Sequence, residues 1–245
     1  MPPSLHALLV EEIQAERLIA MATLLAGPGS GAKMLIWPER QTGSLGDGGL
    51  DAEVLQVATA ALARQQSERF TFRQGESEWD VFVDVHPPPP QLVIVGAVHI
   101  AIPLVTFAKT LGFRTIVVDA RRAFATQERF AHADRLLIGW PADILADLNL
   151  NESTCLVTLT HDEKLDNPAL LLAINSPVRY IGALGSRRTH TARVAALQEE
   201  GATDAQLARI HAPIGLELGG RRPEEIAVAV IAQIVQVINE KKMVG

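Results

Sequence analysis

The stretch 91–122, QLVIVGAVHIAIPLVTFAKTLGFRTIVVDARR, limits the possible folds of this chain more than any other segment. It begins with a short apolar run rich in β-branched residues, which is typical of a strand buried on both faces of a parallel sheet. A turn at Gly96 leads into apolar residues at helical spacing, and Gly112 ends that helix. A second apolar run then closes with Asp119. This order predicts a βαβ unit in which Asp119 would meet a ribose hydroxyl.

Strands and helices continue to alternate after this unit. The expected strands are 92–96, 113–118, 135–139, 154–160 and 178–183, and the expected helices lie near 98–111, 142–148, 167–175, 188–200 and 224–240. Such alternation predicts a parallel sheet with right-handed crossover helices. The region 91–245 is therefore predicted to be an α/β domain, a Rossmann-like doubly wound sheet with strand order 3-2-1-4-5.

The residues before this sheet predict a smaller N-terminal α+β domain, 1–86. Its expected elements are a helix at 4–16 capped by Ser4, a hairpin of 17–26 and 33–37, a helix capped by Asp51 that ends near 66, and strands at 69–73 and 79–85. Four consecutive prolines, 87–90, fit neither a helix nor a central strand, so they predict a semi-rigid linker between the domains. A proline-rich ligand for a partner is the alternative.

Composition excludes several classes of protein. A hydrophobic share of 48% is enough for a sizeable core, and a net charge of −6 argues against nucleic acid as a partner. No apolar run reaches the roughly 18 residues of a membrane span, and no secretory leader is visible, so we expect a cytoplasmic protein without a membrane partner. The single Cys155 excludes an internal disulfide and is expected to be a buried apolar residue.

In the expected strand order, ligands bind beyond the carboxyl ends of the first and fourth strands. Three loops should meet there: GAVHI at 96–100, THDEK at 160–164 and ALGSRR at 183–188. Each loop is polar or glycine-rich, which is typical of a binding site. The candidate ligand-binding residues are Gly96, Ala97, Val98, His99, Asp119, Thr160, His161, Asp162, Gly182, Gly185, Ser186, Arg187 and Arg188. No catalytic residue is assigned.

The third of these loops has the clearest chemistry. Glycine freedom, the Ser186 hydroxyl and two permanent cations, Arg187 and Arg188, stand at the opening of a predicted helix. That combination suits phosphate or another anion, because a helix N-terminus offers N–H groups and a favourable dipole. Solvated surface arginines are the alternative.

The other two loops have weaker signals. Val98 and Ala101 stand where a G-x-G-x-x-G fingerprint has glycines, so tight binding of NAD in the usual pose is not expected. In the second loop, His161 and Asp162 could orient each other for hydrogen bonding, unless Asp162 simply caps the next helix. His99 would add a third possible metal ligand, but the spacing is not that of a zinc site and no metal is assigned.

Four segments carry a family resemblance: THDEKLDNPAL at 160–170, GALGSRRTH at 182–190, RIHAPIGLELG at 209–219 and RRPEEIAVAVIAQI at 221–234. They resemble the C-terminal domain of the XdhC/CoxI family, maturation factors of xanthine and carbon-monoxide dehydrogenases. The resemblance covers about 91–240 strongly and the N-terminal part more loosely. It implies a chaperone rather than an enzyme, one that binds molybdenum cofactor, as molybdopterin or its dinucleotide form, and supports its sulfuration and insertion.

The resemblance also implies partners, and the chain departs from the family at one motif. The partners would be a molybdenum hydroxylase apoenzyme and a sulfurtransferase. A homodimer is also expected, because the apolar helix 226–238 fits a dimer interface as well as a core. Many family members carry a Gly-Gly-Cys-x-Glu motif, whereas here Gly48 and Gly49 are followed by Leu50 and Asp51. A thiol is therefore missing at that place.

On this interpretation the pterin phosphate would lie on Arg187 and Arg188, while Arg121 and Arg122 could accommodate an extra phosphate. Two other functions stay open from the residues alone. One is an NAD(P)-dependent oxidoreductase, which Asp119 and its βαβ unit favour. The other is an interaction module whose Rossmann half has no ligand.

Overall fold

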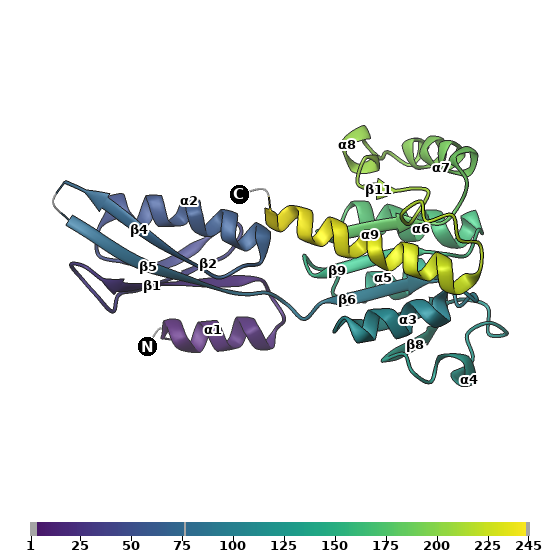
Figure 1. Ribbon diagram of the computed structural model, residues 1–245, viewed down its shortest axis with the longest axis horizontal. Coiled ribbons are helices and arrows are strands. Elements are labelled where there is room, and N and C mark those ends of the chain that lie inside the picture. Colours follow the sequence, from purple (N-terminus) through teal and green to yellow (C-terminus); the bar gives the residue numbers. More distant parts are fainter. Residues whose placement is uncertain (1–3, 76, 244–245) are drawn as a thin grey trace. The chain divides into compact units, whose positions relative to one another are not determined.

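The computed structural model describes residues 4–75 and 77–243 (Figure 1). The chain divides into two compact units, and the division falls inside the proline run, between Pro88 and Pro89. The first unit holds an antiparallel sheet and the second a parallel sheet covered by helices on both faces. The predicted α/β class, a Rossmann-like sheet joined to a smaller α+β part, is confirmed.

The sheet of the first unit has the order β3-β2-β1-β5-β4, and its paired strands are all antiparallel. The strands are β1 (Ile19–Ala26), β2 (Lys33–Ile36), β3 (Gln41–Ser44), β4 (Glu68–Gln74) and β5 (Ser77–His86). Alternate residues face opposite sides, so Ile19 and Leu35 pack with α1 (Leu5–Gln14), while Ala20 and Ile36 pack with α2 (Gly48–Arg64). The two helices lie on opposite faces of the sheet (Figure 1).

The helix caps of this unit test the sequence predictions closely. Ser4 caps α1 as predicted, accepting a hydrogen bond from the Ala7 N–H at 3.1 Å. The prediction that Asp51 caps α2 is wrong, because Asp47 does so and accepts from Gly49 N and Leu50 N at 2.8 and 2.9 Å. Asp51 lies in the first turn and accepts from the Leu45 N–H at 2.8 Å. It therefore fixes the glycine-rich segment against the helix.

The parallel sheet of the second unit has the order β11-β10-β9-β6-β7-β8. Its strands are β6 (Gln91–Val95), β7 (Arg114–Asp119), β8 (Arg135–Ile138), β9 (Thr154–Thr158), β10 (Tyr180–Ala183) and β11 (Ile210–His211). The predicted order 3-2-1-4-5 is confirmed, and β11 extends it beyond β10. β11 was not among the expected strands, since a two-residue edge strand leaves no periodic pattern.

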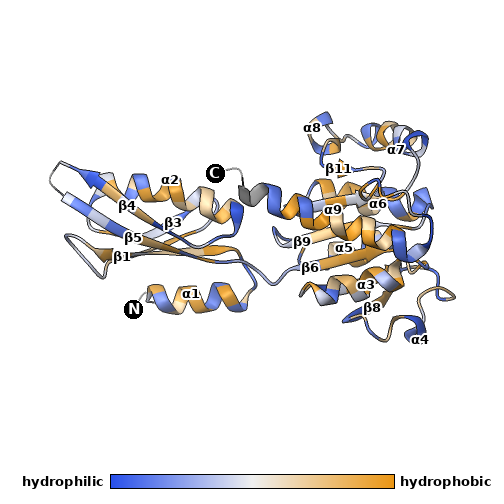
Figure 2. Ribbon diagram, viewed as in Figure 1, coloured by the Kyte–Doolittle hydropathy of each residue, from blue (hydrophilic) through white to orange (hydrophobic). Residues whose placement is uncertain are grey.

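Helices cover both faces of this sheet, which explains why its central strands are largely apolar, as Figure 2 shows for β6. The helices are α3 (Ala101–Thr110), α4 (Gln127–Phe130), α5 (Pro141–Ala146), α6 (Glu163–Ile174), α7 (Arg187–Glu199), α8 (Asp204–Leu207) and α9 (Pro223–Met243). Leu92 and Ile94 face the core that includes α3 and α9. Val93 and Val95 face the core that includes α5, α6 and α7.

Two differences from the predicted helices bear on the site. We expected a helix at 167–175, but α6 begins four residues earlier and contains Pro168, because Asp162 caps its first turn. In the first βα turn, residues 98–100 precede α3 instead of belonging to it. Cys155 is fully buried in β9, as predicted. Within the described residues, we find no helix with the length and apolar character needed to cross a membrane.

Candidate ligand-binding site

The carboxyl ends of β6, β9 and β10 lie side by side. Thr158 of β9 pairs with Val95 on one side and with Ala183 on the other. The loops that follow these three strands are the three loops that the sequence predicted to meet. Because β6 leads to α3 on one face of the sheet and β9 leads to α6 on the other, the crossovers diverge here, which is where open α/β sheets bind ligands.

Gly96 sets the contact between the first two loops. Its φ of +115° lies in a region that residues with side chains rarely adopt. A Cβ at this position would lie 2.8 Å from Thr160 Cγ2 and 3.2 Å from the carbonyl carbon of Leu159. The glycine is therefore required for the first turn to approach the end of β9. In the rest of this turn Val98 is half-buried and His99 is exposed.

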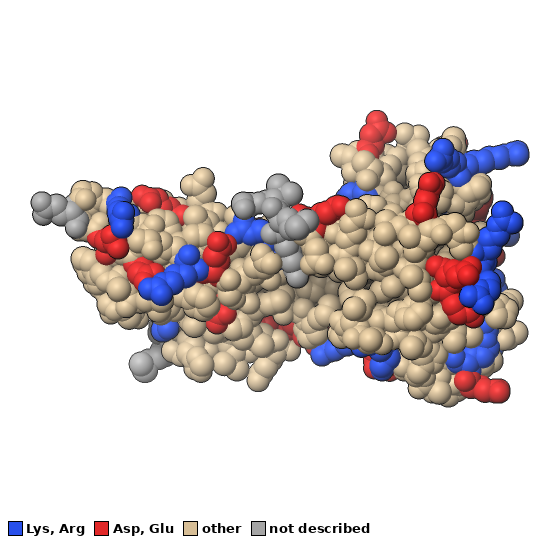
Figure 3. Space-filling model, viewed as in Figure 1, with Lys and Arg blue, Asp and Glu red and all other residues tan. Residues whose placement is uncertain are grey.

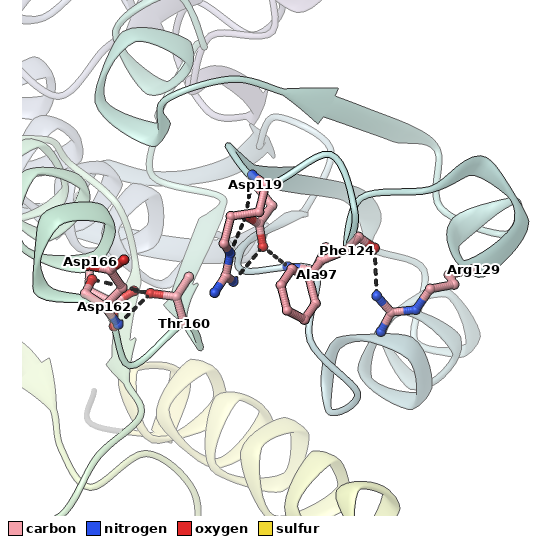
Figure 4. A network of polar contacts seen from close by, with 8 residues as sticks. Ala97, Asp119, Phe124, Arg129, Thr160, Asp162 and Asp166 are labelled. Atoms are coloured by element: carbon pink, nitrogen blue, oxygen red, sulfur yellow. Dashed lines mark hydrogen bonds and ion pairs between the residues drawn. The ribbon is translucent and has the colours of Figure 1, made fainter.

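Asp119 ends β7 and is fully buried. Its carboxylate accepts hydrogen bonds from Ala97 N (2.8 Å), Arg121 N (2.9 Å), Arg121 Nε (2.9 Å) and Arg121 Nη2 (2.8 Å), and the Ala97 bond is drawn in Figure 4. Burial raises the pKa of Asp119, but the hydrogen bonds from Arg121 and Ala97 outweigh burial and hold the pKa below its usual range. Since a carboxylate has about four acceptor positions, these bonds leave none for the ribose hydroxyl predicted there.

From the sequence, Arg121 was expected only to accommodate an extra phosphate. In the structure it makes three of the four hydrogen bonds to the Asp119 carboxylate. Its side chain is 32% exposed, and its guanidinium carbon lies 4.5 Å from the ring centroid of Phe124. The hydrogen bond to Asp119 raises the pKa of Arg121 against the effect of burial, and the charges of Asp119, Asp162 and Asp166 raise it further. Arg121 therefore lies among carboxylates, in surroundings that do not favour a free anion.

The second loop is held by the hydroxyl of Thr160. Thr160 Oγ1 donates to Asp166 Oδ1 at 2.7 Å and accepts from Asp162 N at 3.0 Å, and Figure 4 shows the three side chains in one cluster. Asp162 caps α6 by accepting from Lys164 N at 3.0 Å, which is the capping role that the sequence left open. His161 is exposed, with a φ of +61°. A non-glycine residue in the left-handed region is uncommon and often marks a functional turn.

The third loop opens α7, a helix of 13 residues. Ser186 is its N-cap and accepts from Thr189 N at 3.1 Å, following Gly185, whose φ is +144°. Arg187 is 88% exposed, and its ion pair is loose, with Nη2 at 3.8 Å from Oε1 of the equally exposed Glu217. Arg188 is exposed as well. This loop therefore presents two cations at a helix N-terminus, as an anion site requires.

More arginines lie at the same end of the sheet. Arg122 follows β7, and Arg221 and Arg222 precede α9, and all three are exposed. Figure 3 shows Lys and Arg side chains around the end of this unit toward which β6 runs. By contrast, Gly182, which was predicted with the third loop, lies inside β10. A Cβ there would lie 2.4 Å from Ile214 Cδ1, so this glycine serves packing.

Two buried charged residues were not predicted for the site. Asp166 on α6 and Arg193 on α7 have side chains that are 1% and 2% exposed, with 3.7 Å between Oδ2 and Nη2. Burial raises the pKa of Asp166 despite the opposing effects of Thr160 and Arg193, and burial lowers the pKa of Arg193. The sequence signal was weak: Asp166 and Arg193 each stand four residues before a buried leucine, Leu170 and Leu197, on apolar faces of consecutive helices.

The polar side chains of the site make hydrogen bonds and ion pairs with one another. In the portion of the chain that the structure describes, no three His, Cys, Asp or Glu side chains gather as a metal ligand set would.

Comparison with protein families gives two matches that together span most of the chain. The family model of the XdhC Rossmann domain matches residues 92–234, which covers β6 to α9 and all three loops. The model of the XdhC and CoxI family matches residues 13–73, in the first unit.

Curated relatives agree with these matches. The chain is 30% identical to the uncharacterized protein YqeB of Escherichia coli K12 over 237 residues, 90% of this chain and 43% of YqeB. It is 31% identical to a probable xanthine dehydrogenase subunit of Bacillus subtilis 168 over 157 residues, 64% of this chain and 46% of that protein. It is 34% identical to the molybdenum cofactor insertion chaperone PaoD of E. coli K12 over 92 residues, 38% of this chain and 29% of PaoD. The chain thus spans less than half the length of each.

Among solved structures, a crystal structure of a xanthine dehydrogenase from Bacillus halodurans at 2.80 Å resolution is similar in fold. Its TM-score is 0.56, with 21% identity, and the match covers 96% of either chain. The likeness extends over both units, so the combination of the two folds is shared.

Proposed function

The chain belongs to the XdhC and CoxI family, and from that premise we propose that it is an accessory factor of a molybdenum hydroxylase of the xanthine dehydrogenase type. In this role it binds molybdenum cofactor, as molybdopterin or its dinucleotide form, and delivers it to the apoenzyme. The names of two relatives, a molybdenum cofactor insertion chaperone and a probable subunit of xanthine dehydrogenase, support the proposal.

The observation that carries this proposal is the N-terminus of α7. A pterin cofactor ends in a phosphate, or in a pyrophosphate in its dinucleotide forms, and an anion of that kind fits a helix N-terminus flanked by Arg187 and Arg188. Both arginines are exposed and lie beside the switch point of the sheet. The rest of the ligand would extend toward Thr160 and Asp162, at the end of β9.

The alternative of an NAD(P)-dependent oxidoreductase gains no support from the end of β7. Asp119 would have to recognise the ribose, and Arg121 and Ala97 occupy its acceptor positions. Sulfuration, if this chain supports it, uses sulfur that a partner such as a sulfurtransferase brings to the bound cofactor. The chain's own Cys155 is 0% exposed inside β9, so it is not in a position to relay sulfur.

We also propose that the protein acts in the cytoplasm as a homodimer. α9 turns Ala227, Val230 and Ile234 into the core, so a dimer that uses this helix would use its outer face, where Val228 is 42% exposed. Light scattering coupled to gel filtration would measure the mass, and a monomeric mass at all concentrations would contradict the dimer.

The test of cofactor binding is direct. The chain is expressed together with the enzymes of molybdenum cofactor synthesis and purified, and the bound pterin is oxidised to its fluorescent product and measured. We expect near-stoichiometric pterin in the wild type and a loss of roughly tenfold or more in the double variant Arg187→Ala/Arg188→Ala, because each charge-assisted hydrogen bond contributes about 1.5–3 kcal/mol. Arg135→Ala is the matched control, since Arg135 is an exposed arginine at the amino end of β8.

Delivery is tested by adding the loaded protein to apo-hydroxylase. Activation of the apoenzyme is expected with the wild type and not with the double variant. A wild-type protein that carries no pterin after co-expression and activates no hydroxylase would refute the proposal.

A further inference from the structure

The buried pair of Asp166 and Arg193 leaves several polar atoms without a hydrogen-bond partner. Asp166 Oδ2 and both Nε and Nη1 of Arg193 are buried and make no hydrogen bond within the described structure. Buried polar groups are bonded in the large majority of cases, and a buried ion pair often contributes less than apolar residues of the same volume would. Stability alone is therefore a poor explanation for this pair.

The bonds that the pair does make connect two of the ligand loops. Asp166 Oδ1 accepts from Thr160 Oγ1 at 2.7 Å, and Arg193 Nη2 donates to the carbonyl oxygen of Leu184 at 3.1 Å. Thr160 is the second residue after β9, and Leu184 is the first residue after β10. A continuous series of polar contacts thus runs from one loop through α6 and α7 to the other.

Each end of this series fixes a conformation that the site needs. Thr160 Oγ1 also accepts from Asp162 N, and this bond spans the left-handed turn at His161. Leu184 is followed by Gly185 and by Ser186, the N-cap of α7. A shift of Arg193 would therefore move the anion-binding end of α7, and a shift of Asp166 would move the polar turn beside it.

We propose that Asp166 and Arg193 are positioning residues, which hold the loop after β9 and the loop after β10 at one fixed spacing. The ligand class is one that spans both loops, with an anionic group on the N-terminus of α7 and a polar group at the turn of Thr160 and Asp162. The part of this inference that concerns the ligand rests on the proposed function. The two residues act through their hydrogen bonds to the loops and take no direct part in binding.

One pair of variants separates positioning from simple stabilisation. Arg193→Met leaves Asp166 buried without its cation and is expected to lower Tm by roughly 10 °C. The double variant Asp166→Asn/Arg193→Met removes both charges, and its Tm is expected to return to within a few degrees of the wild type. If the pair positions the loops, the double variant regains Tm but still binds at least roughly tenfold less pterin in the co-expression assay.

The matched control is Lys109→Met/Asp134→Asn. This ion pair has Nζ and Oδ1 at 2.6 Å, and Asp134 bonds Thr115 near the amino end of β7, away from the loops. Its removal is expected to leave pterin content within about twofold. Recovery of full pterin content together with Tm in the Asp166/Arg193 double variant would overturn the positioning role.

A second measurement needs no ligand, so it decides the inference even if the proposed function fails. Thr160→Val removes the hydroxyl at one end of the series, and amide hydrogen exchange is followed by mass spectrometry at 184–190, at the other end. We expect exchange there to accelerate at least roughly fivefold in the wild-type background and to stay unchanged in the Asp166→Asn/Arg193→Met background. No acceleration in the wild-type background, or the same acceleration in both, would overturn the inference. Absence of pterin from the wild type would refute the proposed function alone.

Discussion

Replacing Gly96 by alanine tests whether the first ligand loop is built on close contact with the end of β9. Two costs are expected. The φ of +115° disfavours any side chain, which costs about 1–3 kcal/mol. The new Cβ would also lie 2.8 Å from Thr160 Cγ2 and 3.2 Å from both the Leu159 carbonyl carbon and the Thr160 amide nitrogen. Two of these three neighbours are backbone atoms, which cannot rotate away, so overpacking adds about 1–3 kcal/mol.

Gly112 provides the matched control. It has a φ of +84°, and a Cβ built on it would meet no atom within 4 Å. Gly112→Ala therefore carries the conformational cost alone, about 1–2 kcal/mol. The two substitutions are chemically identical and lie in the same βαβ unit, on either side of α3, so the difference between them isolates the contact with Thr160 and Leu159.

The assay is urea unfolding of the full chain, followed by far-ultraviolet circular dichroism and by tryptophan fluorescence. Trp140 reports on the second unit, and Trp37 and Trp79 report on the first. We expect Gly96→Ala to lower the free energy of unfolding of the second unit by about 2–6 kcal/mol, and at least about 1 kcal/mol more than Gly112→Ala does. Equal losses in the two variants, within about 0.5 kcal/mol, would refute the close approach of the two loops.

Three further outcomes are expected. Asp47→Ala should lower the free energy of unfolding by about 1 kcal/mol in urea titrations, since it removes the cap of α2, and an unchanged midpoint would contradict that cap. The pKa of Asp134 is lowered from 3.8 to about 2 by hydrogen bonds from Lys109 and from the Thr115 N–H. The carboxylate of Asp134 therefore contributes to stability above pH 3.8, and this contribution is lost as pH falls through 2. Tm should therefore fall less steeply in Asp134→Asn than in the wild type across that window. Burial raises the pKa of Asp166, so the contribution of its protonated form to stability is present below pH 3.8 and lost as pH rises through the folded-state pKa. Over that rise, the Tm of Asp166→Asn should increase relative to that of the wild type. Parallel Tm curves would contradict the shift.

Much of the fold could be predicted because it depends on local patterns. The β-branched runs of β6, β7 and β9 are apolar on both faces, which only a sheet covered on two sides explains. The alternation with helices then leaves few topologies. The short elements α4, α8 and β11 were not predicted, because one helical turn or a two-residue strand depends on tertiary contacts and leaves no period in the sequence.

The cap of α2 shows a second kind of failure. Asp47 and Asp51 are both acidic residues near a helix start, and either could cap it by residue type. The choice depends on where the glycine-rich segment before the helix turns, and Asp51 is used there to bind the Leu45 N–H instead. Sequence alone carries no information on that turn.

The meeting of the three loops could be predicted from strand order, but their polar contacts could not. Topology alone brings together the loops after β6, β9 and β10. Which polar atom bonds which depends on side-chain direction over a long sequence separation. Asp119 and Ala97 are 22 residues apart, and the contact between Asp166 and Arg193 joins two different helices. A sequence pattern identifies the residues on such a surface without showing which of them pair.

The contrast between the ends of β7 and β10 explains how a Rossmann-like sheet can take a ligand other than a nicotinamide dinucleotide. The common recognition scheme needs a free carboxylate at the end of the second strand, and here Arg121 holds Asp119 with a paired hydrogen bond while the turn N–H of Ala97 binds the same group. Exposed cations lie after β7, at Arg122, and at the start of α7, where Arg187 is 88% exposed. The carboxylate at the end of β7 is already bonded, whereas the β10 side offers a helix N-terminus that begins with Arg187 and Arg188. Under the proposed function the anionic group would lie on the β10 side, and the buried pair beneath the two loops would keep its position fixed relative to Thr160.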